Sequence, residues 1–246
     1  MGKGNKVGKT DLSEETYRKA IAMLMVPFAG KLMLFLLCNI AKILYLLPRR
    51  QFDLSTYALT NDESFVINGI WCVMTGYMVW RFCKKNWKLF REYDKTKDGL
   101  RAIGFFITGF VLSIGSAVLI NSYYQLGKEK NVGALDYGSL ANANVWLYLI
   151  VVVFMLPVIE EFLFRGLFFK MLTRKNKLAV ICIQAFLFGI VHLNPIKCIY
   201  TFVFGIVLGI VYQKTQNLLF PICMHIGFNI RYPVLYLLFI AGYRLN

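Results

Sequence analysis

The chain has 246 residues, of which 58% are hydrophobic, and its mean hydropathy is +0.56. These values are too apolar for a water-soluble domain of this length and indicate a polytopic membrane protein. The formal net charge is +15, but the basic residues lie in separate segments rather than in one stripe, which argues against a nucleic-acid partner.

Apolar runs that could span a bilayer follow one another along the chain. They predict an all-α protein, a bundle of about eight transmembrane helices near residues 20–47, 65–83, 102–121, 145–170, 178–193, 197–213, 217–230 and 232–243. Two connections combine a polar residue with proline and indicate breaks or tight turns: Asn194-Pro195 and Arg231-Tyr232-Pro233. The last runs are short, so the predicted count is seven or eight.

The basic residues favour one side of the membrane. If the spans alternate in direction, nineteen of the 28 Lys and Arg residues fall on one side and six on the other, and Lys31, Lys42 and Arg165 lie within spans. The positive-inside rule then predicts a multi-pass protein of the cell membrane with both termini in the cytoplasm. The segment from Arg81 to Arg101 is a candidate contact with anionic membrane lipids, although a solvated loop explains it more simply.

Two adjacent glutamates, Glu160 and Glu161, lie in the fourth apolar run. On a helix their side chains point about 100° apart, so they can take different roles. Glu161 and Arg165 are four residues apart in the orientation that favours an ion pair. This pairing would hold Arg165 in the membrane and leave Glu160 free to act as a general base. A purely structural ion-pair cluster between helices is the alternative.

The two histidines of the chain, His192 and His225, lie in apolar stretches, and Asn229 shares a helix face with His225. With Glu160 they place polar groups on three predicted helices, which is typical of sites built between facing helices. In a water-activating site, the glutamate would take a proton from water, His192 would hold that water, and His225 with Asn229 would donate to the oxyanion. A zinc site of the two histidines and the glutamate fits the same residues but lacks a His-Glu-x-x-His sequence, so zinc ranks second and we expect no cofactor.

Four segments resemble the motifs of the CPBP family, which comprises the CAAX prenyl proteases and the bacteriocin-processing or Abi-type membrane proteases. They follow the family's order over roughly residues 145–230: Glu160-Glu161-Phe-Leu-Phe-Arg165-Gly166, Phe188-Gly-Ile-Val-His192-Leu-Asn194, Phe202-Val-Phe-Gly205-Ile-Val-Leu-Gly209 and Pro221-Ile-Cys-Met-His225-Ile-Gly-Phe-Asn229. The resemblance implies an intramembrane endopeptidase of the glutamic type, with a bundle of about eight helices around a polar cavity.

The resemblance also implies a role for each site residue, namely Glu160, Glu161, Arg165, His192, His225 and Asn229. The first glutamate would activate water with His192 as its partner, and the second histidine and the asparagine would stabilise the oxyanion. The second glutamate and the arginine would brace the site. Gly205 and Gly209 would let a neighbouring helix approach closely.

On this interpretation the chain has a basic cytoplasmic tail (1–19), an N-terminal group of transmembrane helices with their loops (20–143) and a catalytic helical region (144–246). The substrate would be a peptide or protein tail at the membrane, either a bacteriocin or signal-peptide precursor or a CAAX-type protein. Two alternatives from other classes of protein stay open. One is a non-catalytic membrane partner or immunity protein that binds a sensor kinase, transporter or toxin. The other is a proton-coupled transporter, for which the chain shows no inverted repeat.

Overall fold

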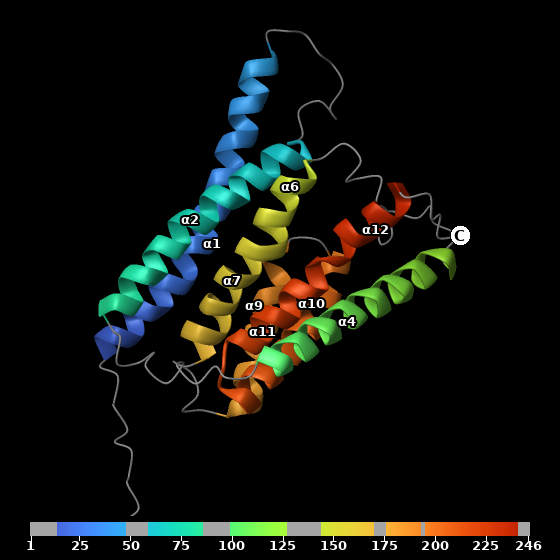
Figure 1. Ribbon diagram of the computed structural model, residues 1–246. Helices are drawn as coiled ribbons and strands as arrows, with labels where there is room; N and C mark the ends of the chain where they lie inside the picture. The colour runs from blue at the N-terminus through green and yellow to red at the C-terminus, as the bar shows by residue number, and fades with distance from the viewer. Residues whose placement is uncertain are drawn as a thin grey trace, which may run out of the picture.

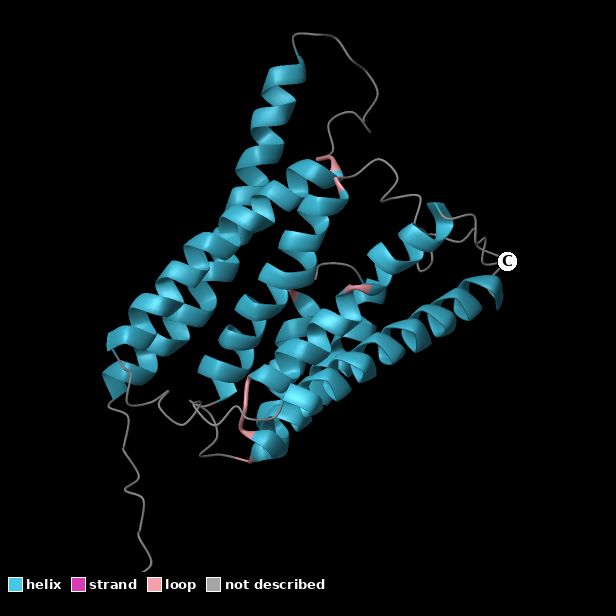
Figure 2. Cartoon of the chain, in the orientation of Figure 1, coloured by secondary structure: helices cyan, strands magenta, loops and turns pink. Residues whose placement is uncertain are grey.

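The computed structural model describes residues 14–47, 59–85, 99–126, 144–169, 176–192 and 195–240, and every element in these ranges is a helix (Figures 1 and 2). The all-α prediction is therefore confirmed. The helices in chain order are α1 (Glu14–Leu46), α2 (Asn61–Lys85), α4 (Gly99–Leu126), α6 (Val145–Tyr148), η4 (Leu149–Met155), α7 (Leu156–Glu161), η5 (Phe162–Phe169), α9 (Lys177–Ile190), α10 (Pro195–Thr215), α11 (Leu219–Asn229) and α12 (Arg231–Ile240).

The eight apolar runs coincide with helices, but eight complete spans are not confirmed. Among the described residues, four segments are long and apolar enough to cross a membrane: Met25–Leu46, Gly99–Ile120, Val145–Phe169 and Lys197–Thr215. Helices α9, α11 and α12 have 14, 11 and 10 residues. At 1.5 Å per residue each rises only about 15 to 21 Å, which is less than the roughly 30 Å of a bilayer core. The chain is a multi-pass membrane protein in which short helices complete the bundle.

Helices α1 and α2 pack side by side (Figure 1), and α1 also contacts η5 while α2 contacts η4 and α7. The indole of Trp71 in α2 donates a hydrogen bond to the Pro27 carbonyl of α1 at 2.6 Å. The ring of Phe28 lies 5.8 Å from that of Trp71 and 5.4 Å from that of Phe164. These contacts place α1 against the segment that carries the two glutamates.

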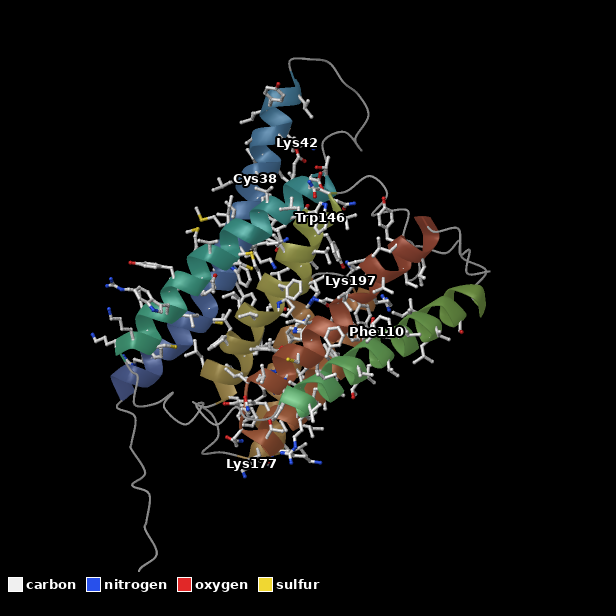
Figure 3. All side chains as sticks on the ribbon, in the orientation of Figure 1. Cys38, Lys42, Phe110, Trp146, Lys177 and Lys197 are labelled. Carbon is white, nitrogen blue, oxygen red and sulfur yellow. The ribbon has the colours of Figure 1, made fainter. Side chains whose placement is uncertain are left out.

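The start of α2 joins three helices at one end of the molecule, where Figure 3 labels Lys42 and Trp146. The Thr60 hydroxyl accepts from the Glu63 amide at 3.2 Å and the Glu63 carboxylate accepts from the Thr60 amide at 2.7 Å, a reciprocal capping box. Glu63 also pairs with Lys42 of α1 at 2.7 Å, and Asp62 accepts from the Asn144 amide that precedes α6.

Residues 145–169 form one helical rod with two π-helical stretches, η4 and η5, on either side of α7. Pro157 explains part of this geometry, since it has no N–H and so cannot continue either an α or a π ladder. The Leu156 N–H instead donates to the Val151 carbonyl, five residues back. π turns are rare and widen a helix locally, and they are frequent at functional sites.

Glycines allow two close helix crossings. A Cβ at Gly109 of α4 would collide with the Met224 carbonyl of α11, and one at Gly227 of α11 would collide with the Phe106 carbonyl of α4. In the second crossing, a Cβ at Gly205 of α10 would lie 3.1 Å from the Ala185 Cα of α9, and one at Gly209 would meet the Gln184 side chain. The predicted close approach at Gly205 and Gly209 is confirmed, whereas the α4 crossing was not anticipated.

The loop predictions have mixed outcomes. The predicted break at Asn194-Pro195 falls between α9 and α10, and Asn194 lies outside the described residues. The segments 1–13, 86–98 and 170–175, which carry many of the basic residues, also lie outside them. The break predicted at Arg231-Tyr232-Pro233 is confirmed one residue earlier: a turn at Ile230 separates α11 from α12, and Arg231, which is buried, begins α12. Pro233 fits there because proline is tolerated in the first turn of a helix.

Candidate active site

The predicted ion pair between Glu161 and Arg165 is confirmed. The Arg165 Nη1 donates to the Glu161 Oε1 at 2.7 Å, and both side chains are 0% exposed. The second guanidinium nitrogen, Nη2, donates to the Gly205 carbonyl of α10 at 3.1 Å. Arg165 therefore joins its own helix to α10 at Gly205, the residue at which α10 also approaches α9 closely. A buried charge needs such partners, because an unpaired one is strongly destabilising.

His225 lies between the two glutamates. Its Nδ1 donates to the Glu161 Oε1 at 2.9 Å, since an ionised carboxylate can only accept. Its Nε2 lies 3.9 Å from the Glu160 Oε2. Glu160 is 6% exposed. The 2.7 Å ion pair with Arg165 is made by Glu161 and not by Glu160. The structure thus fixes His225 in orientation through one glutamate and presents its free nitrogen to the other.

His192 follows the end of α9 and is half-buried. Its Nδ1 donates to the Phe188 carbonyl one turn earlier, at 2.8 Å, which leaves Nε2 for other contacts. The Phe188 ring meets both imidazoles edge-on, with centroids 5.3 Å from His192 and 5.6 Å from His225. Glu160 and His225 are electrostatic neighbours of His192. The three predicted helices therefore do bring their polar groups together.

One of the two side-chain amide protons of Asn229 makes a hydrogen bond within the fold. Its Nδ2 donates to the Val152 carbonyl of η4 at 2.9 Å. In a π ladder this carbonyl would accept from residue 157, but Pro157 has no N–H. The asparagine thus satisfies a carbonyl that the helix itself leaves open. The second amide proton remains available to a ligand.

The N-terminal helices contribute residues that sequence reasoning did not place in the site. The Lys31 Nζ of α1 lies 4.7 Å from the Trp71 ring centroid, and Lys31 is an electrostatic neighbour of both Cys72 and His192. The available signal was a lysine inside an apolar run. Phe188 was noted only for its spacing from His192. The Gly205 carbonyl had no signal in the sequence, because a backbone acceptor is visible only in the fold.

A metal arrangement was also considered. Among the described residues, no group of three or more His, Cys, Asp and Glu side chains is placed to hold a metal ion. What the site does offer is a buried carboxylate, two imidazoles with one free nitrogen each, and an amide donor. Such groups can move a proton to and from water and stabilise a negative oxygen.

The fold and site define a helical multi-pass membrane protein with a buried acid and histidine centre. Comparison with family models shows that residues 142–231 match the family described as type II CAAX prenyl endopeptidase Rce1-like. This match confirms the resemblance of that part of the chain to the CAAX protease family. The match contains the six site residues and excludes α1, α2 and α4. No curated protein and no solved structure gave a significant match. The family is one of proteases, which supports a membrane protease of the CAAX type.

Proposed function

We propose that the protein is an intramembrane endopeptidase in which Glu160 activates water to cleave a membrane-associated peptide or protein tail. The observation that carries this proposal is the unequal treatment of the two glutamates. Glu161 is held by Arg165 and His225, whereas Glu160 is buried with its Oε2 3.9 Å from the His225 Nε2. That separation is too long for a direct hydrogen bond and allows both atoms to contact one water molecule.

The proposed reaction uses the glutamate first as a base and then as an acid. The water donates one O–H to the Glu160 carboxylate and the other to the His225 Nε2, and its oxygen attacks the carbonyl carbon as Glu160 takes the proton. The carbonyl π electrons move to the oxygen, which becomes an oxyanion. When the C–N bond breaks, Glu160 returns the proton to the leaving nitrogen.

Donors for the oxyanion would come from His192 and Asn229. The two histidines thus exchange the roles that the resemblance implies, because the His225 Nε2 lies near the Glu160 carboxylate. The second Asn229 amide proton can donate, and the His192 Nε2 can donate when the imidazole is protonated. Glu161 and Arg165 would act as positioning residues, since they fix the His225 ring. We propose no metal or other cofactor in this reaction.

The substrate we favour is a CAAX-type protein tail, because the matching family model is that of a CAAX prenyl endopeptidase. A bacteriocin or signal-peptide precursor is the second choice. We also propose that both termini lie in the cytoplasm, for which the distribution of Lys and Arg is the support.

The test is cleavage of prenylated CAAX peptides and unmodified peptides by the purified protein in liposomes, followed by mass spectrometry. Wild type is compared with Glu160→Gln, and Glu63→Gln serves as a matched control because Glu63 is exposed and lies in the α2 capping box. We expect Glu160→Gln to lose roughly 100-fold or more of the cleavage rate, since this is the usual size of a general-base contribution. EDTA should leave cleavage unchanged.

Other outcomes would contradict the proposal in different ways. If a folded Glu160→Gln protein cleaves at the wild-type rate, the glutamate has no part in the mechanism. Full loss with EDTA and rescue by zinc would indicate a metalloprotease. If the folded wild type cleaves none of the peptides, the alternative of a non-catalytic membrane partner or immunity protein would be favoured.

A further inference from the structure

A second buried cation lies at the start of α12, outside the proposed catalytic centre. Arg231 is 5% exposed. Its Nη1 donates to the Ser113 carbonyl and approaches the Ser116 hydroxyl of α4 at 3.5 Å. Two buried polar atoms here, the Arg231 Nε and the Ser113 Oγ, have no hydrogen-bond partner among the described residues. No carboxylate in that part of the chain forms a salt bridge with this guanidinium.

One tyrosine ring packs against this arginine, and two further tyrosines lie within electrostatic range of it. The guanidinium carbon of Arg231 lies 4.5 Å from the ring centroid of Tyr232. Tyr148 of α6 and Tyr200 of α10 are electrostatic neighbours of Arg231 and of Tyr232. Arginine with hydroxyl donors is a donor set that suits a carboxylate, which the planar guanidinium can bind with two parallel hydrogen bonds.

An aromatic wall connects this cluster to the proposed catalytic centre. The Tyr200 ring stacks near that of Phe228 at 6.3 Å, Phe228 stacks on Phe204 at 4.1 Å, and Phe204 meets His225 edge-on at 5.6 Å. Asn229, which lies between His225 and Arg231 in the sequence, holds α11 to η4 beside this wall. The arginine cluster and the proposed catalytic centre therefore lie at the two ends of one row of aromatic rings.

We propose that Arg231, with Tyr148, Tyr200 and Tyr232, binds the free α-carboxylate at the C-terminal end of the peptide substrate. This inference rests on the proposed function and names the feature of the substrate that the site recognises. A buried guanidinium is costly to keep without a carboxylate partner, the described residues form no salt bridge with Arg231, and a substrate carboxylate would supply one. An anionic lipid is a poorer occupant, because a side chain 5% exposed does not lie on the lipid-facing surface where a headgroup could reach it.

The spacing of the two centres fits a short tail. His225 and Arg231 are six residues apart on nearly continuous helices, which corresponds to about 9 Å along the axis. The side chains of these two positions point about 120° apart, so the axial rise is the smallest separation of the two centres. An extended peptide covers at most about 3.3 to 3.6 Å per residue, so at least two or three residues would separate the scissile bond from the carboxylate. Arg231 would then help to set the position of cleavage.

The experiment measures peptide binding separately from cleavage. The probe is a prenylated CAAX peptide made in two forms, one with a free C-terminal carboxylate and one with a carboxamide. Binding is measured on the full-length Glu160→Gln protein in detergent, which keeps the peptide intact, and on the same protein with Arg231→Gln or Arg231→Lys. Arg81→Gln, at an exposed arginine of α2, is the matched control. Cleavage of both peptide forms by the wild type is measured in parallel.

We expect the acid to bind about 10- to 100-fold more tightly than the amide, the usual difference for a hydrogen bond to a charged group. Arg231→Gln should abolish this preference, Arg231→Lys should keep part of it, and Arg81→Gln should leave it unchanged. If Arg231→Gln does not fold, the acid and amide affinities of the remaining proteins still decide the matter.

Equal affinity for acid and amide would overturn the subsite, as would an acid preference that persists in Arg231→Gln. Loss of the acid preference on adding phosphatidylglycerol vesicles, but not phosphatidylcholine vesicles, would overturn it in favour of an anionic lipid. Equal cleavage of both forms by the wild type would leave the proposed function intact and remove the subsite. Selective binding of the acid without any cleavage would support the subsite and count against the proposed function.

Discussion

Adjacent glutamates on one helix have different surroundings, and the difference follows from their angular separation. The Glu161 Oε1 accepts from Arg165 of η5 at 2.7 Å and from His225 of α11 at 2.9 Å. Glu160 points about 100° away and has its nearest ion-pair contact, with the His225 Nε2, at 3.9 Å. His225 thus links a braced carboxylate to one that is free to exchange a proton.

Arg165→Ala should destabilise the protein strongly. The substitution leaves Glu161 buried without its cation and removes a donor from the Gly205 carbonyl, and breaking a buried pair in this way costs about 3 to 5 kcal/mol. The measurement is thermal unfolding in detergent, together with the yield of folded protein. Arg81→Ala, at an exposed position, should leave both unchanged. Normal stability of Arg165→Ala would mean that Glu161 has another partner.

The hydrogen bond from Asn229 to the Val152 carbonyl can be tested by a double-mutant cycle. Asn229→Ala should lower the free energy of unfolding by about 1 to 3 kcal/mol. The Val152 carbonyl then loses its hydrogen bond from Asn229, and Pro157 has no N–H with which to replace it. In a Pro157→Ala background the new N–H can reach that carbonyl, so the same substitution should cost less. Unfolding of the four proteins in denaturant gives the coupling energy. Additive costs would show that Pro157 does not create the need for Asn229.

At the scale of the elements, the crossing of α4 and α11 is held by two glycines that face opposite backbones (Figure 1). Gly227 lies between His225 and Asn229 in the sequence, so the depth of this crossing sets the position of both side chains. Helix α4 therefore controls the geometry of the candidate site without contributing one of the six predicted residues to it.

Gly109→Ala should push α4 and α11 apart, because its Cβ would collide with the Met224 backbone, which cannot rotate away. We expect a loss of stability of about 1 to 3 kcal/mol or more. Gly104→Ala and Gly115→Ala are matched controls on the same helix, since a Cβ there meets nothing within 4 Å. They should be neutral or slightly stabilising, given the higher helix propensity of alanine. Thermal unfolding of the three variants would decide, and equal melting temperatures would contradict the close crossing.

The capping box at the start of α2 should make stability depend on pH. The hydrogen bond from Lys42 lowers the pKa of Glu63 below its usual value, and the Thr60 amide adds to this effect. A group with a lowered folded-state pKa stabilises the protein above its unfolded pKa, and this contribution is lost as the pH falls through the folded value. Wild type should therefore lose more stability than Glu63→Gln between neutral and acidic pH. Parallel unfolding curves for the two proteins would remove Glu63 as the cause.

At the scale of the whole molecule, the sequence predicted the features that depend on the geometry of a single helix. The i, i+4 relation of Glu161 and Arg165 and the positions of the apolar runs could be read from the sequence, since helix periodicity fixes both. Which histidine meets which glutamate could not, because that depends on how α7, α9 and α11 pack. The same limit hid the role of Arg231, whose partners in α4 are more than a hundred residues away, and the π turns around Pro157.

The family match covers residues 142–231, yet the helices that precede it complete the packing of the matched region. Helix α4 closes over α11 at Gly227 and supplies the Ser113 carbonyl for Arg231, and α1 places Phe28 against Phe164.

Residues 142–246 expressed alone should therefore not yield a folded protein, since these buried surfaces and the Arg231 guanidinium would lose their partners. Co-expression with residues 1–141 should restore a complex that purifies through a tag on either half. Gly109→Ala in the first half should reduce its recovery, and Gly104→Ala should not. A stable, monodisperse 142–246 fragment would show instead that the matched region folds without the helices before it.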